Sequence, residues 1–124
     1  MSDFALDDAD RWVGDWQAGL EQRLARTRAL SVKLHALTGS AQSGGGLIEA
    51  TVDSAGALTN LYLSDEVRRH SARWIAEQIL TASESARAEL ARQAIQVARE
   101  NGDDETAEGR VLLTAFTDRL GTRR

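Results

Sequence analysis

GGGLIEATVDSAGALTNLYL, at residues 44–63, is the stretch that decides the fold of this chain. Polarity alternates along residues 47–52, which is the period-two pattern of a strand with one buried side. That side is predicted to hold Ile48, Ala50 and Val52. The next four residues, DSAG at 53–56, supply an aspartate that can bond its own backbone and a glycine that can take a positive φ. Residues 47–52 and 57–63 are therefore predicted to pair as a hairpin.

A long helical pattern precedes the hairpin, and the chain has no proline to interrupt it. This helix is predicted to begin near Asp7 or Asp8, where a carboxylate can cap it, and to end at Gly39. Its apolar stripe has the seven-residue spacing of a coiled coil and consists of Val13, Trp16, Leu20, Thr27, Leu30, Leu34 and Leu37. We expect the stripe to pack on the sheet and the second helix. A helix this long outreaches a short hairpin, so part of the stripe is expected to meet a second subunit.

Two further helical patterns follow the hairpin. The second helix is predicted to start at Ser64 or Asp65 and to close at residues 101–102. Its inner stripe consists of Val67, His70, Trp74, Ile75, Ile79, Ala82, Ala86, Leu90, Ala94 and Val97. The acidic residues at 103–105 then favour a third helix start. The apolar face of this third helix is predicted to consist of Val111, Leu112, Leu113, Phe116 and Leu120.

These elements predict an α+β fold, with a long helix, a small antiparallel sheet of two to three strands, a second long helix and a short C-terminal helix. Residues 37–43 are the candidate for an additional strand beside residues 47–52. We expect residues 1–102 to form an α-β-α domain and residues 103–124 to form a helical extension. A hairpin alone is marginal in water, so the flanking helices are expected to cover it. Because the first helix outreaches the hairpin, a homodimer is expected as well. Its candidate interface residues are Trp12, Trp16, Leu20, Trp74, Ile75 and Ile79.

The ordered set of motifs resembles the YbaB/EbfC family of bacterial nucleoid-associated proteins. That family has a glycine-rich bend, an alternating strand, an Asn/Asp-x-x-Gly turn and a second strand before the last helix. Here residues 44–63, followed by the polar helix start at 64–66, carry the likeness, which extends over about residues 9–100. The resemblance implies a YbaB-like dimer that binds DNA with little sequence preference. Relatives usually end soon after the second long helix, whereas this chain continues to Arg124.

Composition excludes several classes of function. The chain has no cysteine, which removes disulfides, thiolate metal sites and thiol catalysis. Only His35 and His70 could act as general bases near pH 7, and neither has a nucleophile motif or metal-ligand spacing nearby. We therefore expect a non-enzymatic protein without cofactor or metal. No apolar run reaches the roughly 18 residues of a membrane span and no signal peptide is evident, which predicts a location in the cytoplasm. The resemblance to nucleoid-associated proteins implies that this location is at the nucleoid.

Charge is segregated along the chain. The formal net charge of −4 argues against DNA binding as a property of the whole molecule, because phosphate contacts need positive charge. Residues 1–21 contain six acidic residues and one arginine, and residues 101–110 are again acidic. Residues 22–35, in contrast, contain four basic residues and no acid. The candidate DNA-binding residues on the two long helices are Arg23, Arg26, Arg28, Lys33, Arg68, Arg69 and Arg73.

Two functions stay open at this level. In the first, arginines at the tips of paired helices straddle a DNA duplex and hold its phosphates without reading its sequence. In the second, a YbaB-like protein-interaction adaptor, for example a secretion-associated one, docks a partner on its acidic surface and C-terminal helix and binds no DNA. The tryptophans could stack on bases, but tryptophans on an apolar stripe are more typical of core or dimer contacts.

Overall fold

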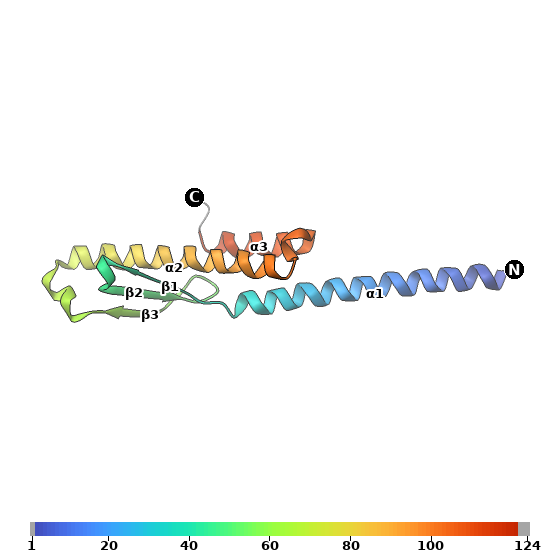
Figure 1. Ribbon diagram of the computed structural model, residues 1–124, viewed down its shortest axis with the longest axis horizontal. Coiled ribbons are helices and arrows are strands. Elements are labelled where there is room, and N and C mark those ends of the chain that lie inside the picture. The colour runs from blue at the N-terminus through green and yellow to red at the C-terminus, as the bar shows by residue number, and fades with distance from the viewer. Residues whose placement is uncertain (1, 122–124) are drawn as a thin grey trace.

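The computed structural model describes the backbone of residues 2–121 and the side chains of residues 7–121. In chain order its α-helices (α), strands (β) and 3₁₀ helices (η) are α1 (Ser2–His35), β1 (Gly39–Ser43), η1 (Gly44–Gly46), β2 (Ile48–Val52), β3 (Leu58–Leu63), η2 (Asp65–Arg69), α2 (Ala72–Glu100), η3 (Asp103–Glu105) and α3 (Ala107–Arg119). Figure 1 shows α2 along the sheet, α3 beside the C-terminal half of α2, and α1 extending away from both. The α+β fold class and the order of its elements are as predicted.

The sheet has three antiparallel strands in the order β1-β2-β3. β2 and β3 form the predicted hairpin, and β1 is the predicted additional strand. At the hairpin turn, Oδ1 of Asp53 accepts hydrogen bonds from the N–H groups of Ala55 and Ala57, and Gly56 has a φ of 83°. The buried side of β2 is also as predicted, because it consists of Ile48, Ala50 and Val52, each with no exposed surface.

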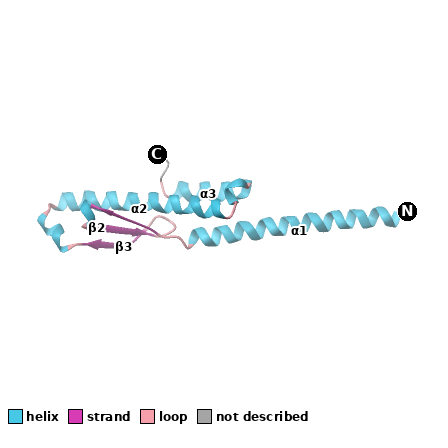
Figure 2. Cartoon of the chain, in the orientation of Figure 1, coloured by secondary structure: helices cyan, strands magenta, loops and turns pink. Residues whose placement is uncertain are grey.

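α2 covers one face of the sheet, as Figure 2 shows. The two layers come close together because small, fully buried side chains, Ala82 and Ala86, lie on α2. Ser43 at the end of β1 donates a hydrogen bond of 2.6 Å from its Oγ to the carbonyl oxygen of Gln78. Gly39 at the start of β1 lies directly against the backbone of Ala86. Within residues 2–121, no helix covers the opposite face of the sheet.

We expect the Gly39→Ala variant to lose about 1–3 kcal/mol of unfolding free energy. The added Cβ would collide with the carbonyl oxygen of Ala86 and would lie 3.0 Å from the Cβ of Leu90, so β1 and α2 would have to separate. Urea denaturation followed by circular dichroism measures the loss. Gly14→Ala is the matched control, because a Cβ there meets nothing within 4 Å and alanine favours a helix. Equal stability of the two variants would contradict the close packing of β1 on α2.

The start of the second long helix differs from the prediction. α2 begins at Ala72 and not at 64–65. Ser64 does cap a helix, but this helix is the short η2, where its Oγ accepts from the N–H group two residues on. The backbone is extended at His70, and Ser71 then caps α2 by accepting from the N–H group three residues on at 3.1 Å. A second capping serine inside the apolar pattern thus restarts the helix.

Both predicted ends of the first helix are also displaced. α1 begins at Ser2 and not near Asp7 or Asp8, because nothing in the preceding turn interrupts the helix. The carboxylates that suggested an N-cap therefore lie inside α1. At the other end α1 stops at His35 and not at Gly39, because Gly39 is already the first residue of β1.

The hydrophobic core has two parts. The larger part combines residues of α1, β2, α2 and α3, namely Leu30, Leu34, Val52, Ala86, Leu90, Ala91, Ala94, Ala98, Phe116 and Leu120. The smaller part consists of Ile48, Ala50, Val67 and Ala82. α3 therefore packs onto its own subunit. In the described part of α1 only Leu30 and Leu34 are buried, so the predicted packing within the subunit holds for the C-terminal part of the stripe and not for its N-terminal part.

Candidate nucleic-acid interface

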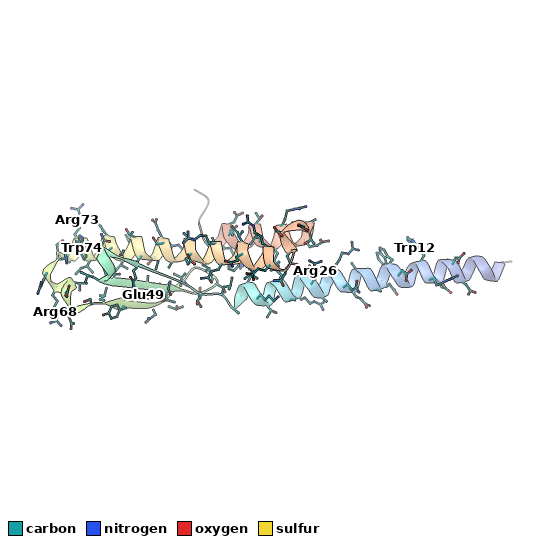
Figure 3. The ribbon with its side chains drawn as sticks, in the orientation of Figure 1. Trp12, Arg26, Glu49, Arg68, Arg73 and Trp74 are labelled. Atoms are coloured by element: carbon teal, nitrogen blue, oxygen red, sulfur yellow. The ribbon has the colours of Figure 1, made fainter. Side chains whose placement is uncertain are left out.

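Three of the predicted DNA-binding arginines lie together at one end of the molecule. Arg68 and Arg69 close η2, and Arg73 lies in the first turn of α2. The break at residues 70–71 separates the short η2 from the long α2 at this end, and Figure 3 shows Arg68 and Arg73 there, with Trp74 nearby. We call Arg68, Arg69 and Arg73 the tip arginines.

The tip arginines are exposed, and their ion pairs within the subunit are weak. Nη2 of Arg68 lies 3.9 Å from Oδ1 of Asp65, and Nε of Arg73 lies 3.4 Å from Oε1 of Glu77. The two arginine side chains are 83% and 90% exposed. Ion pairs of this kind contribute only about 0–1 kcal/mol, so a phosphate could replace either acid at little cost. Among the described residues, the side chain of Arg69 has no ion pair.

The basic residues of α1 differ, because two of them fasten α1 to the turn between α2 and α3. Nη2 of Arg26 donates a hydrogen bond of 2.9 Å to the carbonyl oxygen of Asn101, and its Nε lies 3.5 Å from Oδ1 of Asp103. The Asp103 side chain is only 8% exposed. Nζ of Lys33 donates to Oδ1 of Asn101 at 3.1 Å. A phosphate at Arg26 or Lys33 would therefore compete with bonds inside the subunit.

Arg23 and Arg28 are exposed, and neither has an ion pair within residues 7–121. Figure 3 places Arg26 on α1, beyond the end of the sheet that lies opposite Arg68 and Arg73. One subunit therefore does not bring the predicted basic residues into one surface. It presents the tip arginines at one end and the basic residues of α1 near the middle.

The predicted dimer residues on α1 lie on an exposed surface. Trp12 and Trp16 are 69% and 53% exposed, and Leu20 is partly exposed. Figure 3 shows Trp12 on the part of α1 that extends past the end of α3. This surface has no partner among the described residues of its own subunit.

The predicted dimer residues on α2 have partners within the subunit. Trp74, Ile75 and Ile79 are half-buried and pack against the smaller part of the core. Trp74 also stacks on His70, with ring centroids 3.7 Å apart. Their role between subunits stays a prediction.

The prediction was wrong for one residue of the apolar face of α3. Val111 was expected among the inner residues but is 70% exposed. The core-facing side of α3 is fixed by Phe116 and Leu120, and Val111 falls on the opposite side of the helix at 100° per residue. Sequence reasoning also missed Leu80, which is 68% exposed on α2 and belongs to no predicted stripe.

The contacts of the two histidines are local, and Nδ1 of His35 lies 3.3 Å from the hydroxyl oxygen of Ser31, one turn earlier on the exposed surface of α1. Nδ1 of His35 lies 2.7 Å from the carbonyl oxygen of Ser31, and His70 stacks on an indole ring. Within the described residues, no three His, Asp or Glu side chains gather in the geometry of a metal site. The pKa of Glu89 is lowered by the hydrogen bond and the positive charge of Arg92, which makes it a surface ion pair rather than an acid-base group poised near neutral pH.

Residues 13–104 match the model of the YbaB/EbfC DNA-binding family. The chain belongs to this family. The match ends within η3, so α3 lies outside the region by which YbaB/EbfC proteins are recognised. An uncharacterized protein from Helicobacter pylori, HP0035, has a solved structure that is similar over 66% of this chain and 93% of that chain, with 16% sequence identity and a TM-score of 0.46.

A search of curated proteins found no significant match. Within residues 2–121, no helix combines the length and the hydropathy that crossing a lipid bilayer requires.

Proposed function

We propose that this member of the YbaB/EbfC family is a non-enzymatic nucleoid-associated protein that binds the DNA backbone as a homodimer with little sequence preference. The observation that carries the proposal is the tip arginines in a chain of a DNA-binding family. Guanidinium groups that stand in solvent on a helix end can meet phosphates on any duplex. Contacts to phosphate position a protein on DNA but do not report the sequence of bases.

The overall negative charge is compatible with this function because the acids are concentrated elsewhere. Acidic residues crowd the N-terminal half of α1 and residues 103–108, whereas residues 65–77 hold three acids, Asp65, Glu66 and Glu77, for the three tip arginines. Local potential governs phosphate binding more than net charge does. In a homodimer two sets of tip arginines are available.

A salt titration tests the proposed function. Labelled duplexes of unrelated sequence are expected to bind with similar affinity at low salt. Six phosphate contacts, one for each tip arginine of the dimer, would give a slope of about −5.4 in log K against log salt, so affinity should fall about a thousandfold between 50 and 200 mM. Fluorescence anisotropy measures both properties. No binding at micromolar protein in low salt would contradict the proposal.

The adaptor function is the second candidate, and α3 is the feature that favours it. α3 lies beyond the family-matched residues and exposes Val111, so it offers a surface on which a protein partner could dock. The salt titration separates the two functions, because an adaptor of this kind is expected to leave the duplex free at every salt concentration.

A further inference from the structure

Residues 7–22 of α1, which we call the arm, extend past the other helices, as Figure 1 shows. The apolar side of the arm consists of Trp12, Val13, Trp16 and the partly exposed Leu20. At 3/4 spacing this side continues into Leu30 and Leu34, which are buried against α2 and α3. The apolar side of the arm therefore faces the same way as Leu30 and Leu34. Within the described subunit it has no cover, because α2 and α3, which cover those two residues, do not extend as far as the arm.

A groove lies beside the arm, where α3 begins. It runs between α1 and α3 and is lined mainly by apolar or small residues, namely Thr27, Ala107, Glu108, Val111, Leu112 and Ala115. Arg23 and Arg26 border an adjoining pocket that also reaches Glu108. The groove thus combines an apolar floor with the positive charge of Arg23 on the α1 side and the carboxylate of Glu108 on the α3 side, while Arg26 is paired with Asp103.

We infer that the arm of a second copy of this chain occupies the groove, with the two α1 helices antiparallel about an axis near Leu20. Val13 and Thr27 each lie seven residues from Leu20. A two-fold axis there places Val13 of one copy close to Thr27 of the other, about 10 Å along the helix from the axis. Each arm then covers the groove of its partner. The inference rests on the homodimer of the proposed function and is independent of DNA binding.

Charge selects the second copy as the occupant and fixes the antiparallel direction. The arm carries Asp7, Asp8, Asp10, Asp15 and Glu21 against a single arginine, Arg11, which is already paired with Asp8 at 2.7 Å. The following part of α1, residues 23–33, carries four basic residues and no acid. Antiparallel helices place acid beside base at both ends of the contact, whereas parallel helices would place like charges together.

In the docked dimer, the exposed arginines of α1 would lie against the arm of the partner. Arg23 and Arg28, which lack ion pairs in the described subunit, would then face acidic residues of the partner. The tip arginines, at the other end of the molecule, would remain open to DNA.

Cysteine cross-linking tests the direction of the helices, and the absence of native cysteine makes every added thiol unique. Full-length Val13→Cys and Thr27→Cys variants, one with a tag that changes its mass, are mixed and treated with a short bis-maleimide. We expect a cross-linked heterodimer from the mixture and self-cross-linking of Leu20→Cys alone. Efficient self-cross-linking of Val13→Cys alone, or no cross-link in the mixture, would overturn the antiparallel docking.

Sedimentation equilibrium tests the apolar contact. Trp16→Glu is expected to raise the Kd of the dimer at least about tenfold, because it places a charge in the centre of the interface. Gln17→Glu adds the same side chain one position away from the apolar side, and it should change the Kd by less than about threefold. A monomeric parent protein, or equal effects of the two variants, would overturn the inference. Circular dichroism checks that α1 stays helical in both.

These outcomes separate the inference from DNA binding. Cross-linked antiparallel dimers that fail to bind a duplex would leave the docked arms intact and remove the proposed function. A chain that binds duplex DNA but gives neither cross-link would do the reverse.

Discussion

The Phe116→Ala variant is expected to lose about 3–5 kcal/mol of unfolding free energy, which would leave little of the stability of a domain this size. Phe116 is 1% exposed and belongs to the larger part of the core, together with Leu30 of α1 and Leu90 of α2. Alanine there removes a whole ring and leaves a cavity that three helices border. Urea denaturation at one fixed protein concentration measures the loss, because a dimer makes stability depend on concentration.

Val111→Ala is the matched control on the same helix. Its side chain is 70% exposed in the subunit and lines the groove proposed for the partner's arm, so the change is expected to stay within about 0.5 kcal/mol when both variants are compared at a protein concentration at which the subunits are dissociated. A Phe116→Ala protein as stable as this control would mean that α3 is a detachable extension. The expected result has a practical consequence for the adaptor function. Deleting residues 103–124 removes core residues, so loss of a partner on deletion would not distinguish a lost docking surface from an unfolded subunit.

The hairpin was predictable from sequence because two local rules agree there. Alternation marked the buried side of β2, and the turn needed Asp53 as a backbone acceptor and Gly56 at a positive φ. The start of α2 was not predictable in the same way. Ser64 and Ser71 both carry a capping side chain, so the local sequence does not decide between a continuous helix and two segments. In the fold, Val67 of η2 is buried in the smaller part of the core.

The sequence identified the basic residues of the candidate site, but it did not show which of them lie together on one surface. Residue spacing on a helix indicates which arginines share a face, but the distance between two helices depends on the tertiary fold. Arg26 shows this limit well. Its sequence neighbours suggest a free positive charge, yet the fold brings Asn101 and Asp103 to its guanidinium group. No local pattern relates positions so far apart in the chain.

Reversing two tip arginines, in Arg69→Glu/Arg73→Glu, is expected to weaken binding to duplex DNA by at least about a hundredfold at low salt. The variant removes two positive charges and adds two negative ones in each subunit, at the end of the molecule where phosphate is expected to bind. If every replaced arginine meets one phosphate in the dimer, the slope of log K against log salt should become flatter by about 3.6. Anisotropy titrations at several salt concentrations measure both effects.

Arg99→Glu/Arg110→Glu changes the net charge by the same amount at positions remote from the tip, in the last turn of α2 and on α3. Long-range repulsion alone would weaken binding equally in both double variants and would leave the number of released counterions unchanged. Direct contact lowers the salt slope only when the tip arginines are reversed. Equal slopes in the two variants would therefore place the phosphate contacts elsewhere, with Arg23 and Arg28 of α1 as the next positions to reverse.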